Sequence, residues 1–275
     1  MSARRGVLYL VPNLLDPAAL PEATLPAAAI DRVRSLRRFV VEGEKAAWRL
    51  LSRLLEPEAT AEVVMDRLDE HTPPEALPAL LAPLVAGEDI GLISEAGMPC
   101  VADPGAALAA LAHDRGIAVV PLVGPSSIIL ALAASGLDGQ RFSFLGYLPQ
   151  EPQARKEALA SLDRGIGSDG VTRIFIETPY RNARLLADCL AVLSPRTRLC
   201  VAASLCSPSE RIRSCPVSAW RAGSWPLGKE PAIFLAGRSA ATGSATRPLA
   251  SASSRGRIGS RPASGLDRKA PRGHS

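Results

Sequence analysis

The sequence lacks the cysteine spacing of a disulfide framework or a zinc site. Its 275 residues contain five cysteines, an odd number, and no two of them are arranged as C-x-x-C. A reducing compartment is therefore the simpler assumption. No apolar run approaches the length of a membrane span, and the amino terminus leads directly into a predicted strand instead of a signal-peptide core. These absences predict a cytoplasmic protein that is neither exported nor bound to a membrane.

Several catalytic and phosphate-binding motifs are also missing. No G-x-G-x-x-G run follows a predicted strand, which argues against a dinucleotide oxidoreductase. Residues 223–230 approach the pattern G-x-x-x-x-G-K-[ST], but Glu230 stands where a magnesium-binding hydroxyl is needed, so an NTPase is not expected. His71 and His113 lie far apart without a carboxylate–histidine pattern, so we predict no metal site and no nucleophilic histidine.

The positive charge is confined to one end of the chain. The formal net charge is +5, but residues 239–275 hold seven Lys and Arg side chains against one acid, a net +6. The preceding residues therefore carry −1, which weakens a nucleic-acid interpretation of the folded body. Because this segment is rich in Ser, Ala, Gly and Arg, we expect a disordered basic tail. We interpret it as a plain disordered terminus or the product of an altered reading frame, in preference to an RNA-attracting arm.

Alternating strand and helix patterns predict an α/β protein with a mostly parallel sheet in its first half and a mixed, strand-rich second half. Predicted strands lie at 7–11, 38–41, 63–65, 90–94, 119–123, 142–146, 172–177, 198–203, 211–215 and 232–237. Predicted helices include 46–55, a segment ending near Val85, 152–162 and 179–192. The helix at 46–55 has Trp48, Leu51, Leu54 and Leu55 on one side, and a loose connection is predicted at 164–170. A break at 135–139 predicts two α/β domains, at 1–138 and 139–238.

Two loops at the ends of neighbouring predicted strands are the most informative feature. The first, residues 95–102, keeps mostly small side chains, and Asp103 after it is a predicted N-cap with proline at the first helical position. The second, G-P-S-S at 124–127, has Ser126 as the predicted cap and leaves free backbone N–H groups at a helix N-terminus. Such an end suits a carboxylate, a phosphate or a ribose hydroxyl. Together the loops predict a ligand pocket at the edge of a parallel sheet.

The same loops carry a family resemblance. The run LISEAGMPCVADPG at 92–105 resembles the S-D-A-G-x-P-x-x-x-D-P-G loop of the tetrapyrrole-methylase-like, S-adenosylmethionine-dependent methyltransferases. Within that superfamily the chain is most similar to the ribosomal RNA small subunit methyltransferase I branch. Further matches occur in the same order at LYLVP (8–12), VPLVGPSS (120–127), FLGYLP (144–149) and FIETPYR (175–181).

This resemblance implies that S-adenosyl-L-methionine lies folded between two domains, held mostly by backbone contacts. The matching cofactor positions are Pro12, Ala96, Gly97, Met98, Val101, Ser126, Ser127 and Glu177. It also implies a ribose 2′-hydroxyl of small-subunit ribosomal RNA as the methyl acceptor, and a homodimer.

Two carboxylates are candidates for the proton transfer that a hydroxyl acceptor requires, Glu95 and Glu177. A loop-capping role for Glu95 and a backbone hydrogen-bonding role for Glu177 are the favoured alternatives. Tyr180 and Arg181 either hold a base face and a phosphate or lie on an exposed first helical turn.

The second half of the chain departs from this branch. ASLCS at 203–207 stands in place of an Arg-Glu-Leu-Thr-Lys-like run, and Glu-Thr-Pro-Tyr replaces the more usual Glu-Ser-Pro-His. The cofactor half is thus kept while the substrate half has changed, as in a short sister branch. Methylation of a small molecule or a tetrapyrrole-like ring stays open as an alternative, and so does a non-catalytic domain that binds the cofactor or a partner.

Overall fold

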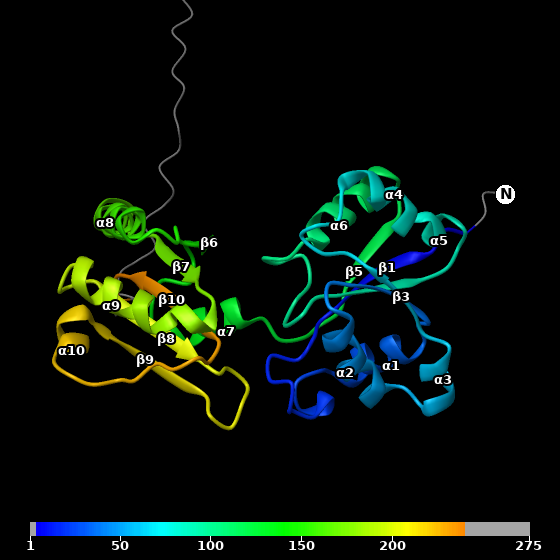
Figure 1. Ribbon diagram of the computed structural model, residues 1–275, viewed down its shortest axis with the longest axis horizontal. Helices are drawn as coiled ribbons and strands as arrows, with labels where there is room; N and C mark the ends of the chain where they lie inside the picture. The colour runs from blue at the N-terminus through cyan, green and yellow to red at the C-terminus, as the bar shows by residue number, and fades with distance from the viewer. Residues whose placement is uncertain (1–3, 240–275) are drawn as a thin grey trace, which may run out of the picture. The chain divides into compact units, whose positions relative to one another are not determined.

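The computed structural model describes residues 4–239 and contains two five-stranded sheets (Figure 1). The first sheet has the order β3-β2-β4-β1-β5, and every neighbouring pair in it is parallel. Its strands are β1 (Val7–Val11), β2 (Arg38–Val41), β3 (Val64–Arg67), β4 (Ile90–Ile93) and β5 (Ala118–Pro121). The predicted α/β class and the parallel first sheet are confirmed. The predicted tail lies outside the described residues, apart from Ser239.

Helices cover both faces of the first sheet, so successive side chains of one strand enter different cores (Figure 1). Tyr9 and Phe39 pack on one face, whereas their neighbours Leu8 and Val40 pack on the other. The helices are α1 (Ala27–Arg34), α2 (Glu44–Leu54) and α3 (Pro57–Ala61) on the first face, and α4 (Leu77–Leu80), α5 (Ala82–Val85) and α6 (Gly105–Asp114) on the second, with 3₁₀ turns at Pro21–Ala23 and Pro74–Ala76. Burial on both faces explains why the central strands β1 and β4 are apolar throughout instead of alternating. The edge strand β3 is more exposed and contains Asp66 and Arg67.

The second sheet is mixed, as predicted, with the order β6-β7-β10-β8-β9. β6 and β7 are parallel and the remaining neighbours are antiparallel. Its strands are β6 (Phe142–Tyr147), β7 (Thr172–Ile176), β8 (Arg198–Ala203), β9 (Arg211–Pro216) and β10 (Ala232–Gly237). Among the described residues, no helix has both the length and the apolarity to cross a membrane.

Four helices cover the second sheet. α8 (Pro152–Asp169), α9 (Asn182–Val192), which follows a 3₁₀ turn at Pro179–Arg181, and α10 (Val217–Arg221) pack on one face, and α7 (Ser127–Ser135) packs on the other. α7 precedes position 138 in the chain yet contacts β8, β9 and β10. The domain boundary between residues 138 and 139 stays a prediction.

Two helices differ from the sequence-based expectation. α8 continues to Asp169, so the loose connection predicted at 164–170 is wrong; Leu159, Leu162 and Ile166 form one buried stripe that holds the helix together across Gly165 and Gly167. In α2, Trp48 is 47% exposed, because Ala47, Leu50, Leu51 and Leu54 form the buried face. The expected helix up to Val85 is divided into two four-residue helices, each with a proline that cannot donate a backbone hydrogen bond.

A buried ion pair joins α8 to α9. Arg155 is 2% exposed, and its Nε donates to Asp188 Oδ2 over 2.8 Å. Its Nη1 also donates to the carbonyl oxygen of Gln150 over 2.8 Å. The guanidinium is therefore balanced by a carboxylate and a main-chain acceptor, so removal of Asp188 leaves an uncompensated charge inside the protein.

Replacing Asp188 with alanine is expected to lower the free energy of unfolding by about 3–5 kcal/mol, the usual cost of breaking a buried pair from one side. Urea denaturation followed by circular dichroism measures this loss. Asp31→Ala is the matched control, because the Asp31–Arg34 pair is exposed and 3.6 Å long; its expected cost is below about 1 kcal/mol. Equal losses in the two variants would contradict the assigned role of the buried pair.

Candidate functional site

Three loops meet at the carboxyl edge of the first sheet, after β1, β4 and β5. Asn13 and Gly97 form an isolated antiparallel bridge, with main-chain N···O distances of 2.9 and 3.1 Å. A Cβ atom added to Gly124 would lie 2.3 Å from Cγ of Pro12, and one added to Gly97 would lie 3.5 Å from the carbonyl oxygen of Pro125. The loops that the sequence singled out therefore pack directly against one another, at the strand ends where open α/β sheets bind ligands.

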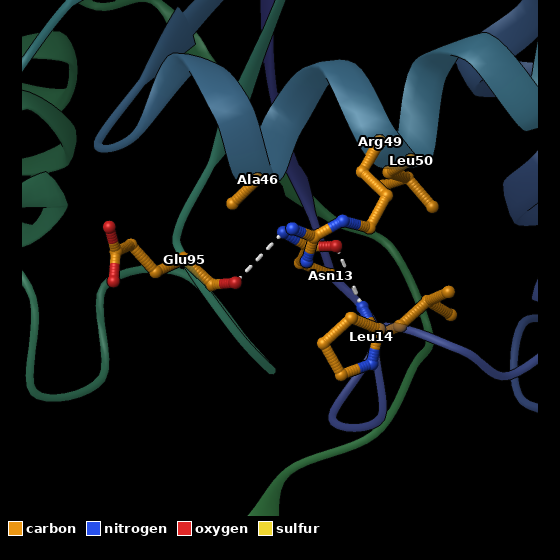
Figure 2. Close-up of a pocket in the computed structure, with 7 residues that line it drawn as sticks. Asn13, Leu14, Ala46, Arg49, Leu50 and Glu95 are labelled. Atoms are coloured by element: carbon orange, nitrogen blue, oxygen red, sulfur yellow. Dashed lines mark hydrogen bonds between the residues drawn. The ribbon is translucent and has the colours of Figure 1, made fainter.

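The Asn13 side chain fastens the first two of these loops together (Figure 2). Its Nδ2 donates to the carbonyl oxygens of Ser94 and Glu95 over 2.9 and 3.0 Å, and its Oδ1 accepts from the Leu14 N–H over 2.8 Å. Asn13 is 4% exposed, so these bonds are shielded from water. Asn13 is not among the site residues predicted from the sequence, although an amide two residues after a buried strand was the available signal.

Asp103 organises the loop after β4. Its Oδ1 accepts from the N–H groups of Cys100 and Gly105 over 3.0 and 2.8 Å, and its Oδ2 accepts from Val101 over 3.2 Å. These bonds hold Cys100 and Ala102 in left-handed conformations, with φ of 67° and 66°. Such angles are costly for residues with a side chain and persist where the surroundings impose them. The predicted N-cap is wrong by one residue, because α6 begins at Gly105 with Pro104 at the N-cap position, but Asp103 still contacts the helix start by accepting from the Gly105 N–H.

Ser126 occupies the N-cap position of α7, as predicted, but its side chain forms no capping hydrogen bond. The first backbone N–H groups of this helix are therefore not used by the Ser126 hydroxyl. This leaves the start of α7 suited to a polar ligand group.

A cavity of about 430 Å³, called the larger cavity below, opens beside the loops. This volume is in the range of roughly 300–1,000 Å³ that is typical of small-molecule sites. The first-sheet loops supply Leu15, Asp16, Pro17 and Ala96 to its wall, Ser127 comes from the start of α7, and residues around the second sheet include Tyr147, Glu177, Ser204, Ser207 and Pro231. The cavity is thus bounded by both sheets' loops.

The larger cavity brings together three of the predicted cofactor positions, Ala96, Ser127 and Glu177. Pro12 and Gly97 are buried and make the loop contacts described above instead of bordering it. In the part of the chain that the structure describes, Met98, Val101 and Ser126 are not among its lining residues either, and Val101 is 44% exposed. The role of each position stays a prediction.

The two candidate catalytic carboxylates border different hollows. The Glu177 side chain is 2% exposed and borders the larger cavity. Its Oε1 accepts from the Thr178 N–H and from Arg181 Nη2, each over 2.7 Å, so its charge is balanced by a guanidinium. Glu95 lies beside a hollow of about 20 Å³ under α2, and its carboxylate points away from Asn13 (Figure 2).

The surroundings of the loop after β4 are acidic. Burial, together with the nearby carboxylates of Asp103, Glu95 and Glu70, raises the pKa of Glu42, whose Oε2 accepts from the Glu95 N–H over 3.0 Å. Burial and the charge of Asp103 raise the pKa of Cys100 to about 11, so this thiol stays neutral at ordinary pH. Within residues 4–239 no cluster of His, Cys, Asp and Glu has the composition of a metal site.

The turn between β8 and β9 gives the larger cavity an uncharged wall. Ser204, Leu205, Ser207 and Ser209 line the cavity, while the Cys206 N–H donates to Glu210 Oε2 over 2.9 Å. Ser204 and Cys206 have φ of 53° and 64°, so the turn holds two side-chain-bearing residues in the left-handed region. This turn overlaps residues 203–207, where the sequence departs from the resembling branch.

Comparison with known proteins agrees with this geometry. The family described as Tetrapyrrole (Corrin/Porphyrin) Methylases matches residues 22–220. The ribosomal RNA small subunit methyltransferase I of Vibrio cholerae serotype O1 is 32% identical over 212 residues, which cover 77% of this chain and 69% of that relative. The protein of the same name from Escherichia coli O157:H7 is 36% identical over 213 residues, covering 78% of this chain and 70% of the relative.

Among solved structures, that of the methyltransferase CobJ resembles this chain with a TM-score of 0.57. The match covers 85% of this chain and 95% of CobJ at 16% sequence identity. At that identity the likeness concerns the fold, and it supports the two-sheet α/β architecture described above.

Replacing Asn13 with alanine removes three hydrogen bonds and leaves the Ser94 and Glu95 carbonyl oxygens without this donor, so the expected loss of stability is about 2–3 kcal/mol. Asn13→Asp should be at least as damaging, because a buried carboxylate faces those same two carbonyl oxygens and donates to neither. Thermal melting followed by circular dichroism compares the three proteins. Unchanged melting of both variants would show that Asn13 does not hold the loops together.

Proposed function

Because the chain belongs to the Tetrapyrrole (Corrin/Porphyrin) Methylases, we propose that it methylates a ribose 2′-hydroxyl in small-subunit ribosomal RNA. The chain is a methyltransferase, and its methyl donor is S-adenosyl-L-methionine. The names of the two bacterial relatives support small-subunit ribosomal RNA as the acceptor. The ribose position follows from the resemblance in the sequence.

The larger cavity is the proposed cofactor site, and its lining fits the donor. Ala96 and Ser127 have small side chains, so a ligand can approach the backbone closely. Asp16 and Glu177 place carboxylates around a ligand that carries a sulfonium charge. When bound, the donor supplies an electrophilic methyl carbon and a sulfur leaving group.

The protein's part in such a displacement is to align the acceptor and to exclude water. We propose that the backbone at 96–98 and at 126–127 contacts the cofactor, with Val101 beside it. Pro12 supports these contacts from behind through its packing against Gly124, and the Gly97 backbone is held in register by its bridge to Asn13. The bridge between Asn13 and Gly97 makes this arrangement rigid before the ligand binds, which lowers the entropy cost of binding.

Glu177 is the better placed of the two candidate carboxylates for proton transfer. It borders the larger cavity, whereas Glu95 borders the smaller hollow under α2. Because Arg181 holds Glu177 Oε1, this carboxylate is also suited to orienting the acceptor hydroxyl through a hydrogen bond. A role for Glu95 in proton transfer stays a prediction.

We also propose a cytoplasmic homodimer. Val120 of the edge strand β5, Val123 after it and Ile129 of α7 are 38%, 71% and 52% exposed, so apolar side chains are available near this sheet edge for a second copy. The edge strand β5 pairs with β1 alone in the described sheet, which leaves its other side open.

A small-molecule acceptor is the second candidate. The uncharged wall at 204–209 and the net charge of −1 before the tail favour it, because phosphate contacts usually supply much of an RNA-binding protein's affinity.

Isothermal titration with S-adenosylhomocysteine is expected to show saturable binding that Gly97→Arg abolishes. Gly97 has φ of +72°, and an added Cβ atom would lie 3.2 Å from Leu15 Cδ2. Ala96→Trp, which fills the larger cavity without a left-handed backbone, should also abolish binding. Gly139→Arg is the control and should bind like the natural chain, since nothing lies within 4 Å of an added Cβ atom there. No heat with the natural chain would contradict the proposed cofactor site.

The acceptor is tested by mass spectrometry of small-subunit ribosomal RNA from a strain that lacks the gene. One ribose methyl group is expected to disappear, to return when the natural gene is supplied, and to stay absent with the Ala96→Trp gene. Unchanged ribose methylation in the deletion strain would reject ribosomal RNA and favour the small-molecule acceptor.

A further inference from the structure

We propose that Tyr180 and Lys229 form a platform on which a base of the acceptor RNA stacks at the margin of the larger cavity. This inference rests on the proposed action on RNA, and it names the residues that would hold the nucleotide next to the reacting ribose. The two residues and the segments that carry them are called the Tyr180–Lys229 platform below.

The exposure of Tyr180 is the first observation. It is 78% exposed, more than any other large apolar or aromatic side chain in residues 4–239. Its neighbours in the chain have defined places: Pro179 lines the larger cavity, and Arg181 pairs with Glu177, which lines it as well. In the free protein this aromatic ring exposes apolar surface to water at the edge of a binding site. A ligand that stacks on the ring would bury that surface.

Lys229 supplies a positive charge at the same place. Its Nζ lies 5.1 Å from the centroid of the Tyr180 ring, within cation–π range. Lys229 takes part in no salt bridge within the described part of the chain, whereas the nearby Arg181 and Arg211 are paired with Glu177 and Glu230. Of these three cations, Lys229 is therefore the one left to meet a phosphate.

Buried contacts hold the two segments in place. Asn182 is fully buried, and its Nδ2 donates to the Glu230 carbonyl oxygen over 2.7 Å, which ties the start of α9 to the Lys229 segment. The Glu230 carboxylate pairs with Arg211, whose guanidinium carbon lies 4.7 Å from the centroid of the Trp225 ring. These contacts fix the backbone that carries the exposed Tyr180 ring and the Lys229 ammonium, so RNA binding costs little conformational entropy.

A nucleotide of single-stranded RNA is the ligand that this combination fits. Proteins recognise unpaired RNA mainly by stacking bases on aromatic side chains and by meeting phosphates with Lys or Arg. A small apolar acceptor would use the ring but not the ammonium, and a duplex would keep its bases stacked inside. The residues before the tail carry a net −1, so the Lys229 ammonium, which forms no salt bridge within residues 4–239, adds a local attraction for phosphate beside the cavity.

The test is the affinity of the full chain, saturated with S-adenosylhomocysteine, for a short fluorescently labelled single-stranded RNA, measured by fluorescence anisotropy. Tyr180→Ala should raise the dissociation constant about 5-fold to 100-fold, the range expected for one lost base stack. Tyr180→Phe keeps the ring and should stay within about 2-fold of the natural chain. Lys229→Met should make the slope of log affinity against log salt concentration shallower, by the amount expected for the loss of about one phosphate contact.

Two matched controls and a second RNA separate the platform from general effects. Trp48→Ala removes another exposed aromatic ring, and Lys156→Met removes another exposed cation, both outside the cavity lining; neither should change the affinity. Duplex RNA of the same length reports attraction by the basic tail, and Tyr180→Ala should leave its affinity unchanged. S-adenosylhomocysteine binding should be equal in all variants.

If Tyr180→Ala and Lys229→Met bind single-stranded RNA as tightly as the natural chain does, the platform is overturned and the proposed function still stands. Equal weakening for duplex and single-stranded RNA would also overturn it, since a stacking site discriminates between them. If the natural chain binds S-adenosylhomocysteine but neither RNA, the proposed acceptor fails and the platform fails with it.

Discussion

The close approach of three loops at one sheet edge is the constraint on which the site depends. Gly97 bridges Asn13 through the main chain, and Gly124 leaves room for Pro12 where a Cβ atom would lie 2.3 Å from the proline ring. Because β4 and β5 flank β1 and all three strands are parallel, their carboxyl ends are brought to the same edge. Leu15 and Ala96, which lie close to these packed residues in the chain, line the larger cavity, so its shape is coupled to the packing of the loops.

The two halves of the cavity wall differ in chemistry. The first-sheet loops are held by main-chain and amide hydrogen bonds, with strained residues at Cys100 and Ala102 that Asp103 keeps in place. The second-sheet side offers serine hydroxyls and one buried carboxylate already paired with Arg181. A rigid wall suits a constant cofactor, while a wall of exchangeable side chains suits acceptors that differ between related enzymes. This division agrees with the sequence, in which the loops at 95–102 and 124–127 keep the family pattern and the segment at 203–207 does not.

Local sequence signals predicted the elements well where one pattern dominated. The strand bounds of β1, β2, β8 and β10 agree with the structure, because these apolar runs of four to six residues, bounded by turn residues, are shorter than an ordinary helix. Trp48 was placed on the wrong face, since a large apolar residue next to a stripe of leucines looks buried until the partner surface is known. The loose connection at 164–170 was wrong for a related reason: Ile166 packs in the core and carries the helix past two glycines.

The sequence by itself determined the α/β class, the parallel first sheet, the two glycine-containing loops and, through their motif, the methyltransferase family. These properties depend on periodicity and on backbone angles, which neighbouring residues dictate. The tertiary structure alone decided that Asn13 fastens the loops, that Glu177 and Glu95 border different hollows, and that α7 packs on the second sheet. Each of these is a contact between residues far apart in the chain, and its free energy exists only once the sheets have placed both partners.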